Sequence, residues 1–283
     1  MRNTILNLIG LHPTNGMYGL EIEAEGNKLP VDDTFTNWWK VERDGSLQAG
    51  FEALEYVMRA PSTLDGVREQ LNHLDSAYKK RGSKIEETQT SGVHVHLNVQ
   101  NYTMKELFTL YTIYFTVEEL LLKYCGAWRE GNHFCLRAKD AEYIIQEFIT
   151  SAKTRNLKNL KTDNLRYCSL NSLSLFKYGS VEFRAMRGTG DLDAIYEWVE
   201  IIDRIRQTAQ EFPDPAEVAR FMSMGGEEEF IRRVFKDKAH HFLSITNRKE
   251  LIKNGIRIIQ PFAFATDWSQ YKDVLVNPFR KGI

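Results

Sequence analysis

Six polar side chains in this sequence form three pairs, and the members of each pair are two residues apart. The pairs are Glu21 and Glu23, His94 and His96, and Glu182 and Arg184. Carboxylate oxygens and imidazole nitrogens bind divalent cations, and a guanidinium group binds phosphate or carboxylate through paired hydrogen bonds. Together the three pairs would suit a site for a divalent metal ion and a phosphorylated ligand.

Each pair lies in a segment whose composition is typical of a β-strand. The segments are residues 19–25, 91–99 and 179–184. Apolar residues such as Ile22, Val95 and Phe183 occupy alternate positions. Residues i and i+2 of a strand point to the same face of a sheet. We therefore expect three strands that carry the paired polar side chains on one face and apolar side chains on the other.

Each pair also has a purely structural interpretation. Glu21 and Glu23 repel each other unless a cation lies between them, but they could line the solvated face of an edge strand. The histidines could both bind metal, could divide metal and phosphate between them, or could be partly buried and hydrogen-bonded. The Glu182–Arg184 pair could hold metal and phosphate, or could be a simple ion pair. A single metal-binding sheet face explains all three pairs with one geometry.

Four further residues are candidates for the same site. Glu55 belongs to a predicted strand, where an inward-facing carboxylate would extend the acidic cluster, and Asp44 lies in an Asp-Gly turn. Arg187 closely follows Arg184, and Arg166 precedes a predicted strand. Each of these two arginines could contact an anion or be a surface charge.

The composition excludes several classes of protein. The chain has 283 residues, 37 basic and 38 acidic, for a net charge of −1, so nucleic acid is not an expected partner. The apolar runs are too short for a membrane span, and no secretory signal pattern is present. The three cysteines do not predict a disulfide framework. We therefore expect a cytoplasmic protein, and no pattern indicates an oligomeric state.

Helical signals alternate with strand signals along the chain. Two Ser/Thr capping boxes, at Ser62 and Thr103, predict helices that end near Gly82 and near Lys123. A third, strongly amphipathic helix contains residues 195–205 and begins at Asp191 or Asp193. Shorter helices are expected over residues 140–149 and 227–235, and residues 153–161 are expected to form a surface loop.

The predicted strands are joined mainly as hairpins. Residues 38–58 suggest one hairpin around the Asp-Gly turn, and residues 167–175 alternate in polarity and suggest a second one with residues 179–184. This order of elements predicts an α+β fold with a mainly antiparallel sheet. We expect a catalytic domain over residues 1–211 and a helical extension over residues 212–283, packed on the same domain.

Several motifs, taken in order, resemble those of the amidoligase family within the glutamine synthetase and γ-glutamylcysteine ligase superfamily. They are Gly-Leu-Glu-Ile-Glu at 19–23, Arg-Asp-Gly-Ser-Leu at 43–47, residues 52–57, Ser-Gly-Val-His-Val-His at 91–96, Tyr-Cys at 124–125, residues 166–171 and Val-Glu-Phe-Arg at 181–184. The resemblance covers roughly residues 17–198. It implies a curved sheet similar to the catalytic domain of glutamine synthetase, with helices packed on the outer face of the sheet.

The resemblance also implies a role for each candidate. Glu21, Glu23, Glu55, His94 and Glu182 resemble the ligands of two Mg²⁺ or Mn²⁺ ions, and Asp44 would take a related acidic position.

The remaining candidates resemble residues that contact the nucleotide and the reacting groups. Arg184 would face the transferred phosphate of ATP, and His96 would lie close to the phosphates or to the second substrate. Arg166 would be a further catalytic arginine, and Arg187 would assist in binding the nucleotide.

The function implied is that of an ATP-dependent carboxylate–amine ligase, which forms an amide through an acyl phosphate. Its partners would be small-molecule or peptide carboxylates and amines. Two alternatives remain open: a metal-dependent hydrolase that uses the same histidines and glutamates, and a catalytically inert binding protein that keeps the fold.

Overall fold

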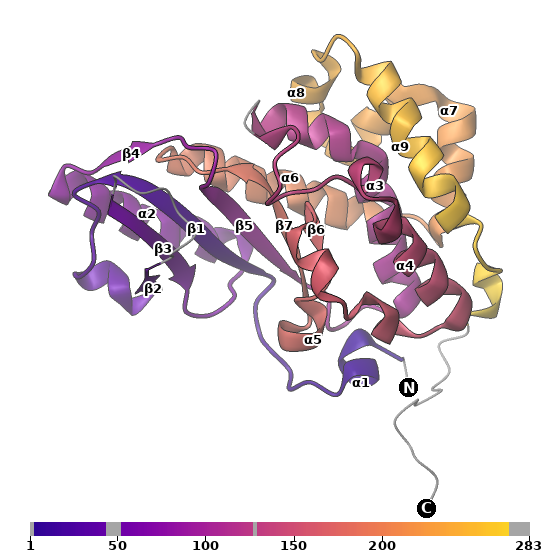
Figure 1. The fold of residues 1–283 in the computed structure, drawn as a ribbon, viewed down its shortest axis with the longest axis horizontal. Helices are drawn as coiled ribbons and strands as arrows, with labels where there is room; N and C mark the ends of the chain where they lie inside the picture. Colours follow the sequence, from indigo (N-terminus) through magenta and orange to yellow (C-terminus); the bar gives the residue numbers. More distant parts are fainter. Residues whose placement is uncertain (1–2, 44–51, 127–128, 272–283) are drawn as a thin grey trace, which may run out of the picture.

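An antiparallel sheet of seven strands forms one side of the molecule (Figure 1). The computed structural model describes residues 3–43, 52–126 and 129–271. The strands are β1 (Tyr18–Asn27), β2 (Trp39–Glu42), β3 (Glu52–Met58), β4 (Lys84–Glu86), β5 (Gly92–Asn98), β6 (Leu170–Asn171) and β7 (Ser180–Arg187). Their order in the sheet is β2-β3-β1-β5-β7-β6, and β4 pairs with β1. The predicted α+β class with a mainly antiparallel sheet is confirmed.

The helices cover one face of the sheet and continue beyond its β6 edge. They are α1 (Ile5–Ile9), α2 (Leu64–Arg81), α3 (Met104–Cys125), α4 (Glu142–Thr154), α5 (Leu175–Tyr178), α6 (Leu192–Ala209), α7 (Pro215–Phe235), α8 (Ala239–Leu243) and α9 (Arg248–Ala263). Helix α2 contacts β1 and α6, and α3 contacts β7 and α6. Helices α7 and α9 pack on α3, and α4 packs on α9, which gives the helical half seen in Figure 1. None of the helices in the described ranges has the length and apolar character needed to cross a membrane.

Side-chain alternation explains which face of the sheet is covered. In β1 the side chains of Leu20, Ile22 and Ala24 are buried in the core, and in β5 those of Val93 and Val95 are buried with them. The polar residues between them project to the opposite face, because successive strand residues alternate.

Helix α3 is apolar on almost all sides because it lies between the sheet and α7 and α9. Its predicted capping box is confirmed: the Thr103 side chain accepts from the backbone N–H of Glu106, and the Glu106 carboxylate accepts from that of Thr103. Asp191, one of the two residues predicted to begin α6, caps that helix. The capping box predicted at Ser62 is wrong, because the N-cap of α2 is Thr63, whose hydroxyl accepts from Gly66 N.

The predicted strand over residues 167–175 is mostly wrong. Only Leu170–Asn171 pairs with β7, and the chain then turns into α5. The Asn171 side chain accepts from Leu173 N, and Ser174 Oγ donates to the Asn171 carbonyl. These local side-chain bonds compete with a strand ladder and bend the backbone, although the apolar residues still alternate.

The surface loop predicted over residues 153–161 is also wrong in part. Helix α4 continues to Thr154, and a 3₁₀ segment η4 (Leu157–Leu160) follows. Leu157 and Leu160 are both buried, since residues three apart share one side of a 3₁₀ turn. Asn156 begins the turn by accepting from Lys158 N.

The C-terminal region holds more helix than its pattern predicts. The helix expected at residues 227–235 is the second half of α7, which continues from Pro215 across a non-helical Gly226. Helix α9 has no predicted counterpart, although its Leu251, Ile252 and Ile259 are buried. The division of the chain at residue 211 stays a prediction.

Candidate active site

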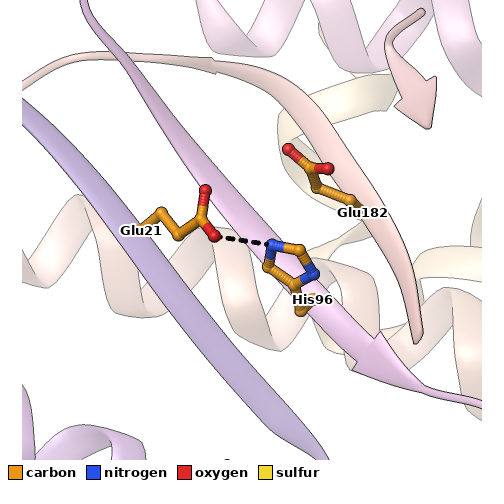
Figure 2. A group of neighbouring side chains, drawn as sticks. All are labelled: Glu21, His96 and Glu182. Atoms are coloured by element: carbon orange, nitrogen blue, oxygen red, sulfur yellow. Dashed lines mark ion pairs between the residues drawn. The ribbon is translucent and has the colours of Figure 1, made fainter. Parts of the chain in front are cut away.

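Strand register brings the three polar pairs together on the uncovered face of the sheet. Glu21 on β1 lies opposite His94 on β5. A second row crosses four strands: Gly19 lies opposite His96, which lies opposite Glu182, which lies opposite Asn171. Directly opposed residues in antiparallel strands share a face. Figure 2 shows the side chains of Glu21, His96 and Glu182 projecting from three neighbouring strands toward one another.

A β-bulge adds Arg184 to this cluster. The pairing of β5 with β7 shifts between Val93 and Val95, so that two residues of β7 lie against His94. One guanidinium nitrogen of Arg184 donates to Glu182 at 2.5 Å and lies 3.5 Å from Nδ1 of His94. The hairpin residue Glu55 approaches from β3, where it lies opposite Glu23.

Glu21 joins the two imidazoles. Its Oε1 lies 3.2 Å from Nε2 of His96, and its Oε2 lies 3.4 Å from Nδ1 of His94. The same His94 nitrogen is 3.5 Å from Glu182 Oε1. Glu182 is only 5% exposed, and its second oxygen accepts from Asn171 Nδ2 at 2.6 Å. The cluster is therefore compact and has limited contact with solvent.

The charges in the cluster shift one another's protonation. Burial raises the pKa of Glu21, but hydrogen bonds with His94 and His96 outweigh burial and lower the pKa well below its usual range. Burial also acts against ionised Glu182, yet Arg184 and the imidazoles outweigh it and lower its pKa. Burial lowers the pKa of His96, but Glu21 and Glu182 produce a net increase. The carboxylates are thus held in the ionised form that binds cations.

The donor atoms fit a divalent metal ion. One ligand atom from each of Glu21, His96 and Glu182 lies within 4.8 Å of the other two, and the same holds for Glu21, Glu55 and His94. Oxygen ligands suit Mg²⁺ and Mn²⁺, and Mn²⁺ also accepts imidazole nitrogen. Glu21 belongs to both groups, so two such ions would share one carboxylate.

Two cavities meet at this cluster, and Glu21 lines both. The polar cavity, of about 670 Å³, has four acidic residues and four arginines in its lining: Glu21, Glu23, Glu42, Glu55, Arg43, Arg129, Arg166 and Arg184. The mixed cavity, of about 410 Å³, is lined by His96 and by apolar residues such as Met17, Val57 and Pro61.

Most of the candidate residues predicted from the sequence lie at this cluster. The structure brings together Glu21, Glu23, Glu55, His94, Glu182 and Arg184, with His96 on the side of the mixed cavity. Arg166 is exposed and lines the polar cavity. Arg187 is directed elsewhere, because its Nε donates to Glu87 and its terminal nitrogen donates to the carbonyl of Cys125. The Asp44 turn lies outside the described residues.

Sequence patterns did not indicate Arg129, which is 1% exposed. Its guanidinium donates to the carbonyls of Ser91, Arg184 and Ala185, and so ties the start of β5 to the bulge in β7. Gly92 makes room for it: a Cβ there would lie 3.3 Å from Arg129, from Glu23 and from His94. Arg129 stands in an irregular segment with no periodic pattern, so nothing in the local sequence marks it.

Arg43 and Asn171 were also missed as site residues. Arg43 follows β2 and lines the polar cavity. Asn171 belongs to the motif at residues 166–171, and that motif was the feature of the sequence that could have indicated its contact with Glu182.

The exposed face of the sheet therefore carries carboxylates, imidazoles and an arginine, the groups that bind metal ions and anions in proteins. The profile of a family described as "putative amidoligase enzyme" matches residues 14–206. The chain belongs to this family. The matched range contains the strands of the sheet and the residues of the cluster, and membership supports a ligase-like enzyme that acts on small molecules. No curated protein matches the chain.

Proposed function

We propose that the protein is an ATP-dependent ligase that joins a carboxylate to an amine. The observation that carries the proposal is the meeting of Glu21, His94, Glu182 and Arg184 at one end of a charged cavity, in a chain of the amidoligase family. Polyphosphate is strongly anionic and binds with divalent cations, so the arginines of the cavity would contact the phosphates and its carboxylates would hold the cations.

The two groups of ligands would hold Mg²⁺ or Mn²⁺ when nucleotide is bound. Glu21, Glu55 and His94 would form one site, and Glu21, His96 and Glu182 the other. Glu23, whose Oε1 lies 3.9 Å from His94 Nε2, would support the first site. The metal ions would supply positive charge that offsets the charge on the phosphate oxygens.

The reaction needs positioning more than covalent help from the protein. An oxygen of the substrate carboxylate attacks the γ-phosphorus of ATP, the bond to ADP breaks, and an acyl phosphate forms. The amine nitrogen then attacks the acyl carbon, phosphate leaves, and the nitrogen loses a proton to water. Arg184 would orient the transferred phosphoryl group, with Arg43 and Arg166 on the same cavity wall.

The test combines metal binding with turnover. Mn²⁺ binding would be measured by electron paramagnetic resonance, and release of ADP and phosphate would be followed with Mg²⁺, ATP and a panel of carboxylates and amines. We expect Glu21→Gln and Glu182→Gln to weaken Mn²⁺ binding by about 10- to 100-fold, while Glu228→Gln, on the exposed surface of α7, leaves it unchanged.

ADP release that depends on both a carboxylate and an amine would support the ligase. Hydrolysis of a substrate without nucleotide would point to a metallohydrolase instead. Unchanged Mn²⁺ binding in both cluster variants would refute the metal site and, with it, the proposed chemistry.

A further inference from the structure

The mixed cavity beside the metal-binding cluster has a chemical character of its own. The end of β3 and the start of β1 line it, and Gly19 and Leu20 are among the lining residues. Glu21 is the acidic residue in its lining, and Arg59 and Lys177 are also part of the lining. Between these charges the wall is apolar, with the partly exposed side chains of Met17, Val57 and Pro61.

Two side-chain amides, of which that of Gln100 is buried, hold the segments around this cavity in place. Gln100 is 3% exposed, its Oε1 accepts from Thr14 N at 2.9 Å, and its Nε2 donates to the carbonyl of Tyr178 at 3.0 Å. Asn98 Nδ2 donates to the carbonyls of Thr14 and Gly16 at 3.0 and 2.9 Å. The segment before β1 and the start of β7 are therefore held at fixed positions around the cavity.

The charged groups stand at separate points of the lining. Glu21 lies opposite Val57, and Arg59 follows two residues later in the chain, just after the end of β3. Arg59 Nε donates to the carbonyl of Thr36, which fixes the guanidinium at the β3 side. Lys177 comes just before β7, on the other side of β1 and β5, with its ammonium 4.5 Å from the ring centre of Tyr178.

This pattern matches a zwitterion with an apolar body. An ammonium group would be attracted to the carboxylate of Glu21, and a carboxylate group would be attracted to Arg59 or Lys177. Phosphate is a poor match for the apolar walls, and a neutral base would leave the two cationic groups without a counterpart. A cavity of about 410 Å³ has the size of sites that enclose small organic ligands.

We propose that the mixed cavity is the amine-substrate site, and that its substrate is an apolar amino acid or short apolar peptide whose terminal amine lies at the Glu21 side of the cavity. This rests on the proposed function. Because Glu21 lines both cavities, an amine bound there lies beside the polar cavity in which the carboxylate would be activated. The product would then carry its new amide on the amino terminus of an apolar residue.

The experiment uses the full-length protein and isothermal titration calorimetry with L-leucyl-L-leucine. Two derivatives each lack one charge: N-acetyl-leucyl-leucine and leucyl-leucinamide. We expect the dipeptide to bind and each derivative to bind at least about tenfold more weakly, since each loses one ion pair.

Three variants test the location. Gly19→Leu should abolish dipeptide binding, because a Cβ at Gly19 meets only His96 Cβ at 3.6 Å, so the fold accepts it while the rest of the side chain fills the cavity floor. Arg59→Met and Lys177→Met remove the cationic groups one at a time, and at least one of them should weaken binding about tenfold. Lys253→Met, an exposed change on α9, is the matched control and should have no effect.

The outcomes separate this proposal from the proposed function. Equal binding of the dipeptide and its derivatives, no binding at all, or binding unaffected by all three cavity variants would overturn the amine site. Displacement of the dipeptide by adenosine would assign the cavity to the nucleotide base and overturn it as well. Mn²⁺ and a non-hydrolysable ATP analogue are titrated in parallel. If neither binds, the result contradicts the proposed ligase function and not only the assignment of the cavity.

Discussion

The guanidinium of Arg129 donates a hydrogen bond of 2.6 Å to the backbone carbonyl of Arg184. The same group binds the carbonyls of Ala185 and Ser91, so one buried side chain holds the β-bulge that turns Arg184 toward Glu182. This contact links a residue outside every sequence motif to a residue at the centre of the cluster.

Replacing Arg129 by methionine should therefore destabilise the protein. The change removes the guanidinium donor from three carbonyls in a buried region, and we expect a loss of about 3 kcal/mol in the free energy of unfolding, measured with urea. Arg232→Met removes an exposed ion pair with Glu228 and should cost less than about 0.5 kcal/mol. Similar losses in the two variants would show that Arg129 does not hold the bulge.

Asn171 should tune metal binding without being a ligand. Its side chain holds Glu182 Oε2 at 2.6 Å, and groups that orient metal ligands affect affinity by about 10- to 100-fold. We expect Asn171→Ala to weaken Mn²⁺ binding within that range, as measured by electron paramagnetic resonance. Asn72→Ala, at an exposed position of α2, serves as control. An unchanged affinity in Asn171→Ala would remove this supporting role.

Glu118 should make stability depend on pH. Burial raises its pKa from 4.5 to about 7, although Ser169 and the N–H of Ala138 donate to it. Because the folded pKa is the higher one, folded Glu118 binds more protons between these values. Its stabilising contribution is complete below pH 4.5 and is lost as pH rises through about 7.

The difference between the two pKa values of Glu118 corresponds to about 3 kcal/mol in the free energy of unfolding. We expect Glu118→Gln to remove most of this dependence when urea unfolding is compared from about pH 5 to pH 8. Glu69→Gln, an exposed change on α2, should retain the slope of the unaltered protein. If Glu118→Gln keeps the slope of the unaltered protein, then other groups cause the dependence of stability on pH.

The start of α2 gives a test of the capping residue. Thr63→Ala removes the hydroxyl that accepts from Gly66 N, and we expect a loss of about 1 kcal/mol in the free energy of unfolding. Ser62→Ala should change it by less than about 0.5 kcal/mol, since the contacts of Ser62 with Tyr18 use backbone atoms. A larger effect at Ser62 would restore the capping box predicted from the sequence.

Sequence patterns were enough to predict which residues of the cluster share a face within each strand. Glu21 with Glu23, and His94 with His96, follow from the two-residue period of an extended chain, which is a local property of the backbone. The cap at Thr103 was predictable for the same reason, because it depends on residues three apart. Alternation failed over residues 167–175, where serine and asparagine side chains bind the backbone instead.

Which strands are neighbours, and in what register they pair, depends on the tertiary structure. The contacts that build the cluster are between segments far apart in the chain. They include those of Glu21 with His94 and His96, the bulge that orients Arg184, and the hydrogen bonds that fix Arg129 and Arg187. The two cavities arise in the same way, from walls on several strands and loops. Such contacts depend on how the whole core packs, and a shift of one residue in register would send each polar side chain to the buried face.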